Sequence, residues 1–179
     1  MLDKVNTGLI VVDIQGKLAS LVYDSEVLIA NCEKLIKGAQ ALKLPIICLE
    51  QNPEKLGGTV NKISSLLSSI NPITKFTFNG CDEANFIAAV KAENVDTWLV
   101  CGIEAHICAY QTALGLSECG YSVQLVSDCV SSRTLANKQL GISRLMNKNI
   151  DITGLEMCLY ELVADCRAAE FKAILRLIR

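Results

Sequence analysis

The sequence has a single histidine among its 179 residues. A metal site or catalytic centre that needs two imidazoles is therefore excluded, and we expect no bound metal. Aromatic residues make up only 5% of the chain, which is too few for a surface that stacks nucleic-acid bases. The 17 basic and 19 acidic side chains give a net charge of −2, so the chain lacks the basic field that attracts nucleic acid.

Long hydrophobic runs are also absent. The first apolar run, residues 9–12, ends at Asp13 and is far shorter than a signal-peptide core or the roughly 20 residues of a membrane helix, so no membrane partner is expected. The nine cysteines are an odd number in a chain that is 51% hydrophobic and needs no disulfides to build a core. Reduced thiols and a cytoplasmic location are the expectation. The positive mean hydropathy favours a covered face between subunits, and hence a homo-oligomer.

Two kinds of segment alternate along the chain. Apolar runs rich in Val, Ile and Leu are typical of strands covered on both faces, and they occupy residues 8–14, 44–49, 97–101 and 123–126. Stretches with apolar residues at every third or fourth position predict helices, and they occupy residues 25–43, 82–93, 109–119, 134–147, 155–164 and 168–178. The alternation predicts one three-layer α/β/α domain over residues 1–179, with a Rossmann-like, mostly parallel sheet of about six strands and helices on both faces. Asp82 and Thr134 are expected to cap helices.

Ligands of such a sheet bind at the carboxyl ends of its strands, near the switch point. The segments to examine therefore follow the apolar runs: Asp13, residues 50–52, Lys75, residues 102–108 and Asp128. Neither G-x-G-x-x-G nor G-x-x-x-x-G-K-[ST] occurs, so no nucleotide cofactor is expected.

Cys108 lies in the first turn of a predicted helix, directly after a predicted strand and a short turn. The partial positive charge at a helix N-terminus stabilises a thiolate, and the same N–H groups can bind an oxyanion. Asp13 is placed to accept the thiol proton, and Lys75 is placed to lower the pKa of the thiol further. Acid/base, cation and nucleophile are thus expected at one edge of the sheet.

Four motifs resemble those of the isochorismatase-like cysteine hydrolases, the superfamily that includes nicotinamidase and N-carbamoylsarcosine amidohydrolase. They are VVDIQ with Asp13, LEQNPEKLGGTV after the second strand, ITKFTF with Lys75, and GIEAHICAYQTALGL with Cys108. The later VSDCVSSR and the terminal FKAILRLIR resemble isochorismatase-domain proteins whose physiological substrates are poorly defined. The resemblance covers nearly the whole chain.

The resemblance implies a catalytic triad of Asp13, Lys75 and Cys108. It also implies a cis peptide between Ile103 and Glu104, and an oxyanion hole made by the N–H groups of Glu104 and Cys108. The implied reaction is hydrolysis of a small amide or related C–N bond through a thioester, with Asp13 as the proton carrier. Relatives of this kind are commonly homo-oligomers and act on small molecules.

The sequence also departs from the family. Nicotinamidases hold a metal beside the triad with an Asp and several histidines near the second strand. Here that region reads Glu50-Gln51-Asn52-Pro53, and His106 is the only histidine, so that metal site cannot be built. Isochorismatases proper cleave an enol ether and do not need the cysteine, and this activity stays open as an alternative.

Further residues are candidates for the wall of a substrate pocket: Gln15, Gln51, Asn52, Phe78 and His106. Several have simpler interpretations. Gln51 and Asn52 could only form the turn before Pro53. His106 is two residues from Cys108, a spacing that puts the side chains on different helix faces, so a pocket wall or an interface is favoured over a Cys–His dyad.

Structural roles are also expected for charged residues around the turn. The Glu104 side chain could face solvent with only its backbone used, and Arg133 is expected to pair with Asp128. Cysteines at positions 32, 48, 101 and 158 lie in apolar contexts and are expected to pack as small hydrophobes.

Two other function classes compete with a hydrolase. A non-catalytic binding protein could retain the fold. Such a protein would not need Asp13, Lys75 and Cys108, so the presence of all three argues against this alternative. A thiol redox protein would need a resolving cysteine near Cys108, but Cys101 lies inside a predicted buried strand and no C-x-x-C occurs.

Overall fold

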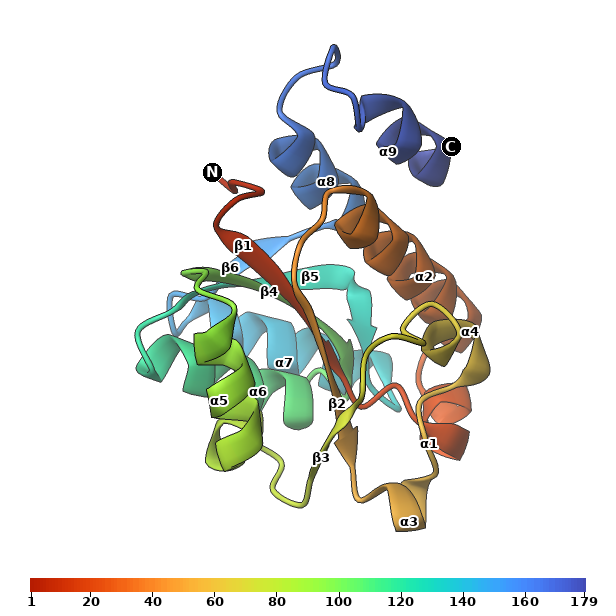
Figure 1. The fold of residues 1–179 in the computed structure, drawn as a ribbon. Coiled ribbons are helices and arrows are strands. Elements are labelled where there is room, and N and C mark those ends of the chain that lie inside the picture. The colour runs from red at the N-terminus through yellow and green to blue at the C-terminus, as the bar shows by residue number, and fades with distance from the viewer.

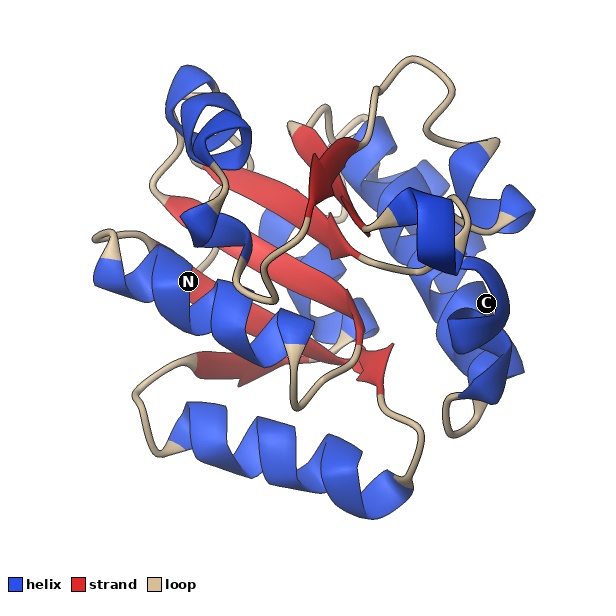
Figure 2. Ribbon diagram, turned by 90° about the horizontal axis from the view of Figure 1, so that it is seen from below, coloured by secondary structure: helices blue, strands red, loops and turns tan.

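The computed structural model describes all 179 residues, Met1–Arg179. Six strands form one sheet in the order β3-β2-β1-β4-β5-β6, and every neighbouring pair is parallel. The strands are β1 (Thr7–Val12), β2 (Ile46–Gln51), β3 (Ile73–Lys75), β4 (Thr97–Ile103), β5 (Ser122–Ser131) and β6 (Asp151–Thr153). Figures 1 and 2 show the sheet at the centre of the molecule with helices on both faces, which confirms the predicted α/β architecture.

Nine α-helices and one short 3-10 helix cover this sheet. They are α1 (Gly16–Leu21), α2 (Ser25–Ala41), α3 (Pro53–Leu56), α4 (Asn61–Ser64), η1 (Gly80–Asp82), α5 (Ala84–Ala92), α6 (Cys108–Glu118), α7 (Leu135–Met146), α8 (Leu155–Val163) and α9 (Phe171–Ile178). The buried residues of α1, α2, α8 and α9 belong to one hydrophobic core, and those of α5, α6 and α7 belong to the other. None of the helices has the length and apolar character needed to cross a membrane.

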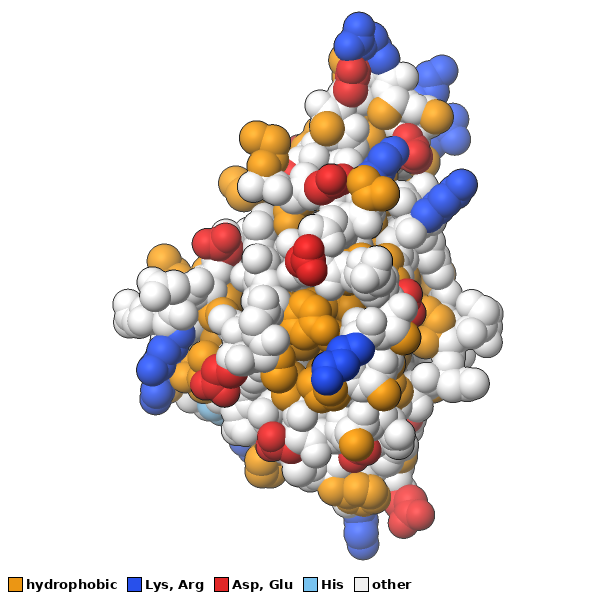
Figure 3. All heavy atoms as spheres, turned by 60° about the vertical axis from the view of Figure 1, so that its left-hand side comes forward, with side chains coloured by type: hydrophobic (Ala, Val, Ile, Leu, Met, Phe, Trp, Pro, Cys, Tyr) orange, Lys and Arg blue, Asp and Glu red, His pale blue; other side chains and the backbone are white.

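The central strand β1 is buried along its whole length. Side chains alternate between the faces of a strand, and here Leu9 and Val11 enter one core while Ile10 and Val12 enter the other. Both faces therefore demand apolar residues, which explains the unbroken hydrophobic run in the sequence. On the face drawn in Figure 3, acidic and basic side chains are interspersed among hydrophobic ones, and neither sign of charge forms a continuous patch there.

Two details of the elements differ from the expectations. The three-residue strands β3 and β6 did not stand out as apolar runs, because each is too short to show a pattern. Asp82 does not cap a helix: it ends η1, and α5 follows Glu83 with no side-chain cap. The Thr134 side chain does cap α7, since its hydroxyl accepts a hydrogen bond from the N–H of Asn137 at 3.2 Å.

The sheet order reverses between β1 and β4, because the chain builds β2 and β3 on one side of β1 and β4 to β6 on the other. The carboxyl ends of these two strands are therefore the switch point at which ligands bind in open α/β sheets. Gly102 permits their close approach. It has φ of +116°, and a Cβ there would lie 2.0 Å from the carbonyl oxygen of Val12.

Candidate active site

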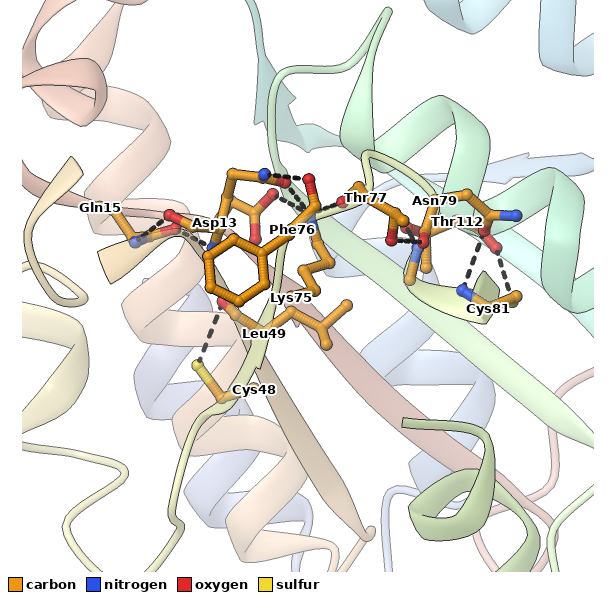
Figure 4. A network of polar contacts seen from close by, with 12 residues as sticks. Asp13, Gln15, Cys48, Leu49, Lys75, Phe76, Thr77, Asn79, Cys81 and Thr112 are labelled. Carbon is orange, nitrogen blue, oxygen red and sulfur yellow. Dashed lines mark hydrogen bonds and ion pairs between the residues drawn. The ribbon is translucent and has the colours of Figure 1, made fainter. Parts of the chain in front are cut away.

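Asp13 and Lys75 form a buried ion pair at the carboxyl edge of the sheet (Figure 4). Asp13 directly follows β1 and Lys75 is the last residue of β3, so parallel pairing through β2 brings both to this edge. Lys75 Nζ donates to Asp13 Oδ2 at 2.7 Å, with the two side chains 0% and 2% exposed. A charged pair this deeply buried is stable only when both partners are present.

Lys75 has two further hydrogen-bond acceptors. Its ammonium also donates to Gln51 Oε1 at 2.7 Å and to the carbonyl oxygen of Thr77 at 3.2 Å. A lysine ammonium has three N–H donors, so all of them are satisfied without water. The ammonium is therefore fixed in position beside Asp13, and Gln51 serves here as a partner of Lys75.

Gln15 joins the segment that follows β1 to the end of β2, beside Asp13 (Figure 4). Its amide Nε2 donates to the carbonyl oxygens of Gln51 at 3.1 Å and Gly57 at 2.7 Å, while its Oε1 accepts from the Gln51 N–H at 2.6 Å. The side chain is fully buried. Both ends of the amide are thus engaged with backbone, and Gln15 positions Gln51 and, through it, Lys75.

Replacing Gln15 with Leu is expected to lower the free energy of unfolding by about 2–4 kcal/mol, because three buried backbone groups lose their partner. Equilibrium unfolding in urea measures this change. The matched control is Gln40→Leu, since Gln40 is exposed and makes one hydrogen bond, to the carbonyl oxygen of Leu66. That variant is expected to cost under about 1 kcal/mol. Equal losses in the two variants would contradict the role given to Gln15.

Cys108 is the first residue of α6 and is 7% exposed. Its thiol lies close enough to Asp13 and Lys75 for both charges to shift its pKa. Asp13 uses Oδ2 for the lysine, and Oδ1 is buried with no hydrogen-bond partner in the chain, so this oxygen is available to accept the thiol proton. The structure therefore brings Asp13, Lys75 and Cys108 together.

The pKa of the Cys108 thiol is raised to about 12, which is opposite to the direction expected from the sequence. Burial is the largest cause, and the negative charge of Asp13 adds to it, while Lys75 acts in the other direction. Burial likewise raises the pKa of Asp13, and the charge of Lys75 opposes this increase only in part. The resting pair is therefore a thiol beside a carboxylate whose affinity for a proton is increased, an arrangement suited to proton transfer between them.

The rate of Cys108 alkylation by iodoacetamide is expected to keep rising with pH above the range in which the rate for an ordinary thiol becomes constant. Only the thiolate reacts, and the raised pKa of Cys108 delays its formation to higher pH. Replacing Asp13 with Asn removes a negative charge that raises this pKa, so the profile should shift to lower pH. Mass spectrometry of the Cys108 peptide measures the rate, with the exposed Cys166 as internal control. A Cys108 profile identical to that of Cys166 would rule out the effect of burial.

The turn before Cys108 contains a cis peptide bond between Ile103 and Glu104, at the position that the resemblance implied. The Glu104 N–H donates to no acceptor in the chain, and Cys108 is the first residue of its helix, so its N–H has no acceptor within α6. Two backbone donors are thus available beside the thiol.

The Glu104 side chain does not face solvent, contrary to one expectation. It is 6% exposed, and its Oε1 accepts hydrogen bonds from the backbone N–H of Arg133 at 3.0 Å and from the Arg133 Nε at 3.1 Å. The expected pair between Arg133 and Asp128 is therefore wrong. Asp128 Oδ1 accepts from the N–H of Leu155 at the start of α8 instead. The Glu104–Arg133 pair fixes the turn that carries the two free donors.

The remaining candidates for the pocket wall, Asn52, Phe78 and His106, lie in three different segments. Asn52 adopts a left-handed conformation directly after β2, and Phe78 is 55% exposed in the segment that follows Lys75. Phe76 in the same segment is 68% exposed, and sequence reasoning missed it although it adjoins the predicted lysine. His106 Nδ1 lies 2.9 Å from Ser132 Oγ, so it contacts the loop after β5.

No group of three or more His, Cys, Asp or Glu side chains is arranged to hold a metal ion. The residues after β2 provide none of the imidazoles that a nicotinamidase-type metal site uses. Glu50 is instead engaged in the protein, because its Oε1 accepts from both the N–H and the hydroxyl of Thr59 at 2.6 Å.

Comparison with known proteins places the chain in a family. Residues 7–157 match the model of the isochorismatase domain. A protein of Phytophthora sojae named secreted isochorismatase effector Isc1 is 31% identical over 180 residues, which cover 96% of this chain and 83% of that protein.

Solved structures of similar fold agree with this match. A structure described as MAR1 ribonuclease from Caenorhabditis elegans superposes with a TM-score of 0.93 at 30% identity, covering 99% of this chain and 91% of that one. The YcaC gene product of Escherichia coli, described as an octameric hydrolase of unknown specificity, shares the fold with a TM-score of 0.92 at 23% identity, covering 98% and 89% of the two chains. The chain described here belongs to the isochorismatase family of hydrolases.

Proposed function

We propose that this protein is a cysteine-dependent hydrolase of a small amide or related C–N bond, with Asp13, Lys75 and Cys108 as its catalytic triad. The observation that carries the proposal is the buried Asp13–Lys75 pair, whose unpartnered Asp13 Oδ1 lies at the same sheet edge as the Cys108 thiol and whose charges shift the pKa of that thiol. A packing cysteine does not require a desolvated carboxylate and ammonium beside it, and burying such a pair is costly.

The first half of the proposed reaction forms a thioester. Asp13 Oδ1 takes the thiol proton as the Cys108 sulfur attacks the carbonyl carbon of the substrate. The carbonyl oxygen becomes negative and is stabilised by the N–H groups of Glu104 and Cys108. The C–N bond then breaks, and Asp13 returns its proton to the departing ammonia or amine.

The second half releases the acid. Asp13 takes a proton from water as the water oxygen attacks the thioester carbon. The C–S bond breaks, and the proton held by Asp13 returns to the sulfur, which restores the resting thiol and carboxylate. Lys75 holds Asp13 in place through its hydrogen bond to Oδ2, and its bonds to Gln51 and Thr77 fix the ammonium itself.

A panel of small primary amides, carbamoyl compounds and ureides tests the proposal through release of ammonia. The supporting result is turnover of at least one member together with an acyl adduct on the Cys108 peptide in mass spectrometry. Isochorismate and a short RNA belong in the same panel, because an enol-ether hydrolase is the alternative and a neighbouring fold is described as a ribonuclease. Turnover of isochorismate or RNA without any amide turnover would contradict the C–N assignment.

The expected setting of the enzyme is part of the proposal. We propose a cytoplasmic homo-oligomer acting on a small molecule. The octameric description of the YcaC fold relative supports assembly, whereas the secreted Phytophthora relative shows that the location varies in this family. Sedimentation or size-exclusion analysis tests the assembly, and a clean monomer would contradict it.

A further inference from the structure

Two cysteines outside the proposed active site, Cys81 and Cys119, lie where η1 packs against α6. Cys81 lies in η1 and is half-buried, and Cys119 is the exposed C-cap residue that directly follows α6. They are 38 positions apart in the sequence, and neither is used by the hydrolase proposal.

The position of the Cys81 sulfur follows from its contacts with α6. It lies 3.9 Å from the carbonyl oxygen of Thr112 (Figure 4), and a Cβ added to Gly115 would lie 2.9 Å from it. The sulfur therefore occupies the space that a side chain at Gly115 would fill. The side chain of Asn79 fills the other side of that space, since its Oδ1 would lie 2.6 Å from the same Cβ.

Cys119 is one helical turn beyond Gly115, on the same face of α6. Side chains of an α-helix lean toward its N-terminus, so we expect the Cys119 thiol to lean over the turn that contains Gly115, toward the space that the Cys81 sulfur occupies. The two thiols are close enough for Cys119 to shift the pKa of Cys81. Burial is the larger cause, and the two effects together raise the pKa of Cys81 to about 12.

We propose that Cys81 and Cys119 are a reversible oxidation site, which forms an intramolecular disulfide when a peroxide is present. The exposed Cys119 sulfur attacks a peroxide oxygen and becomes a sulfenic acid, and one water leaves. The Cys81 sulfur then attacks the Cys119 sulfur, the S–O bond breaks, and a second water leaves. Two thiols and one hydrogen peroxide thus give one disulfide and two waters.

The disulfide would join the segment that follows Lys75 to the helix that begins with Cys108. A cross-link between η1 and α6 limits the freedom of the unfolded chain, so the oxidised protein should unfold at a higher temperature than the reduced protein. Of the other seven cysteines, six are buried, Cys108 among them, and only Cys166 is exposed.

The test is oxidation of the whole protein with hydrogen peroxide, followed by digestion without reductant and mass spectrometry. The expected result is a disulfide-linked Cys81–Cys119 peptide that dithiothreitol separates into its two parts. The oxidised protein should also have a higher midpoint of thermal unfolding than the reduced protein. Cys119→Ser should lose both effects, and because this residue is exposed at a helix end the variant is expected to fold. Cys166→Ser is the matched control and should keep both.

Other outcomes would overturn the proposal. These are linkage of Cys119 to Cys166 or to a second molecule in place of Cys81, or irreversible oxidation of Cys119 while Cys81 stays a thiol. A disulfide between Cys81 and any other cysteine in the Cys119→Ser variant would also overturn it.

Discussion

Replacing Cys108 with Ala is expected to reduce kcat/KM for any amide that the wild-type protein hydrolyses by on the order of 10⁴- to 10⁶-fold, because no other group can form the thioester. The residual rate would come from the two N–H donors at Glu104 and Cys108, which the substitution leaves in place. Initial rates of ammonia release with each hydrolysed amide measure the loss.

The control for this variant is Cys166→Ala, which removes an exposed thiol that is distant in sequence from the triad. Its kcat/KM is expected to match that of the wild type. Because Ala at position 108 removes only the thiol and keeps the backbone and Cβ, the variant is also expected to bind substrate. Unchanged turnover by Cys108→Ala would exclude Cys108 as the nucleophile.

The same variant separates the two hydrolase classes. An enol-ether hydrolase of the isochorismatase type does not use the cysteine, so Cys108→Ala should keep such an activity if that is the function of the protein. If Cys108→Ala loses amide turnover, the bond that the protein cleaves is a C–N bond. If the variant keeps turnover of isochorismate, the bond is an enol ether. The Asp13→Asn variant should lose amide turnover as well, because Asp13 is the proposed proton carrier of that reaction.

The order of segments was sufficient to predict the sheet but not all of its strands. The run that became β1 is apolar at every position because both of its faces are covered, and this pattern is visible in the sequence. β3 has only three residues and Lys75 ends it, so its membership in the sheet depends on pairing with β2 rather than on composition. Short edge strands are therefore the part of such a fold that periodicity cannot reveal.

The sequence likewise predicts some features of the candidate site and not others. The positions of Asp13, Lys75 and Cys108 at one edge follow from strand ends and were predictable. The pairing of Glu104 with Arg133 was not, because it depends on how the turn after β4 meets the end of β5. The direction of the Cys108 pKa also failed to follow from the local helix start, since the dominant cause is burial by residues that are distant in sequence.

Replacing Lys75 with Met is expected to lower the free energy of unfolding by about 3–5 kcal/mol at neutral pH, because the substitution leaves the Asp13 carboxylate buried without its counterion. Met fills a similar volume, so packing contributes little to the loss. Urea unfolding monitored by circular dichroism measures the change. Lys55→Met, at an exposed lysine, is the matched control and is expected to change the value by less than about 0.5 kcal/mol.

The double variant Lys75→Met/Asp13→Asn separates the buried charge from the loss of lysine contacts. Asn suits position 13, which has φ of +50°, because it tolerates the left-handed conformation and carries no charge. The double variant is expected to recover most of the stability lost in Lys75→Met. A double variant less stable than Lys75→Met would show that the lysine acts through its other hydrogen bonds, to Gln51 and Thr77.

The pH dependence of Lys75→Met gives the sharpest form of this prediction. Burial already raises the pKa of Asp13 and Lys75 opposes the increase, so removing Lys75 raises that pKa further. A carboxyl whose folded pKa exceeds its unfolded value stabilises the fold fully below the unfolded pKa, and this contribution disappears as the pH rises through the folded pKa. The stability of Lys75→Met relative to the double variant should therefore be highest in acid and fall toward neutral pH. A difference that is constant with pH would mean that Asp13 in Lys75→Met does not titrate as a buried, unpaired carboxyl.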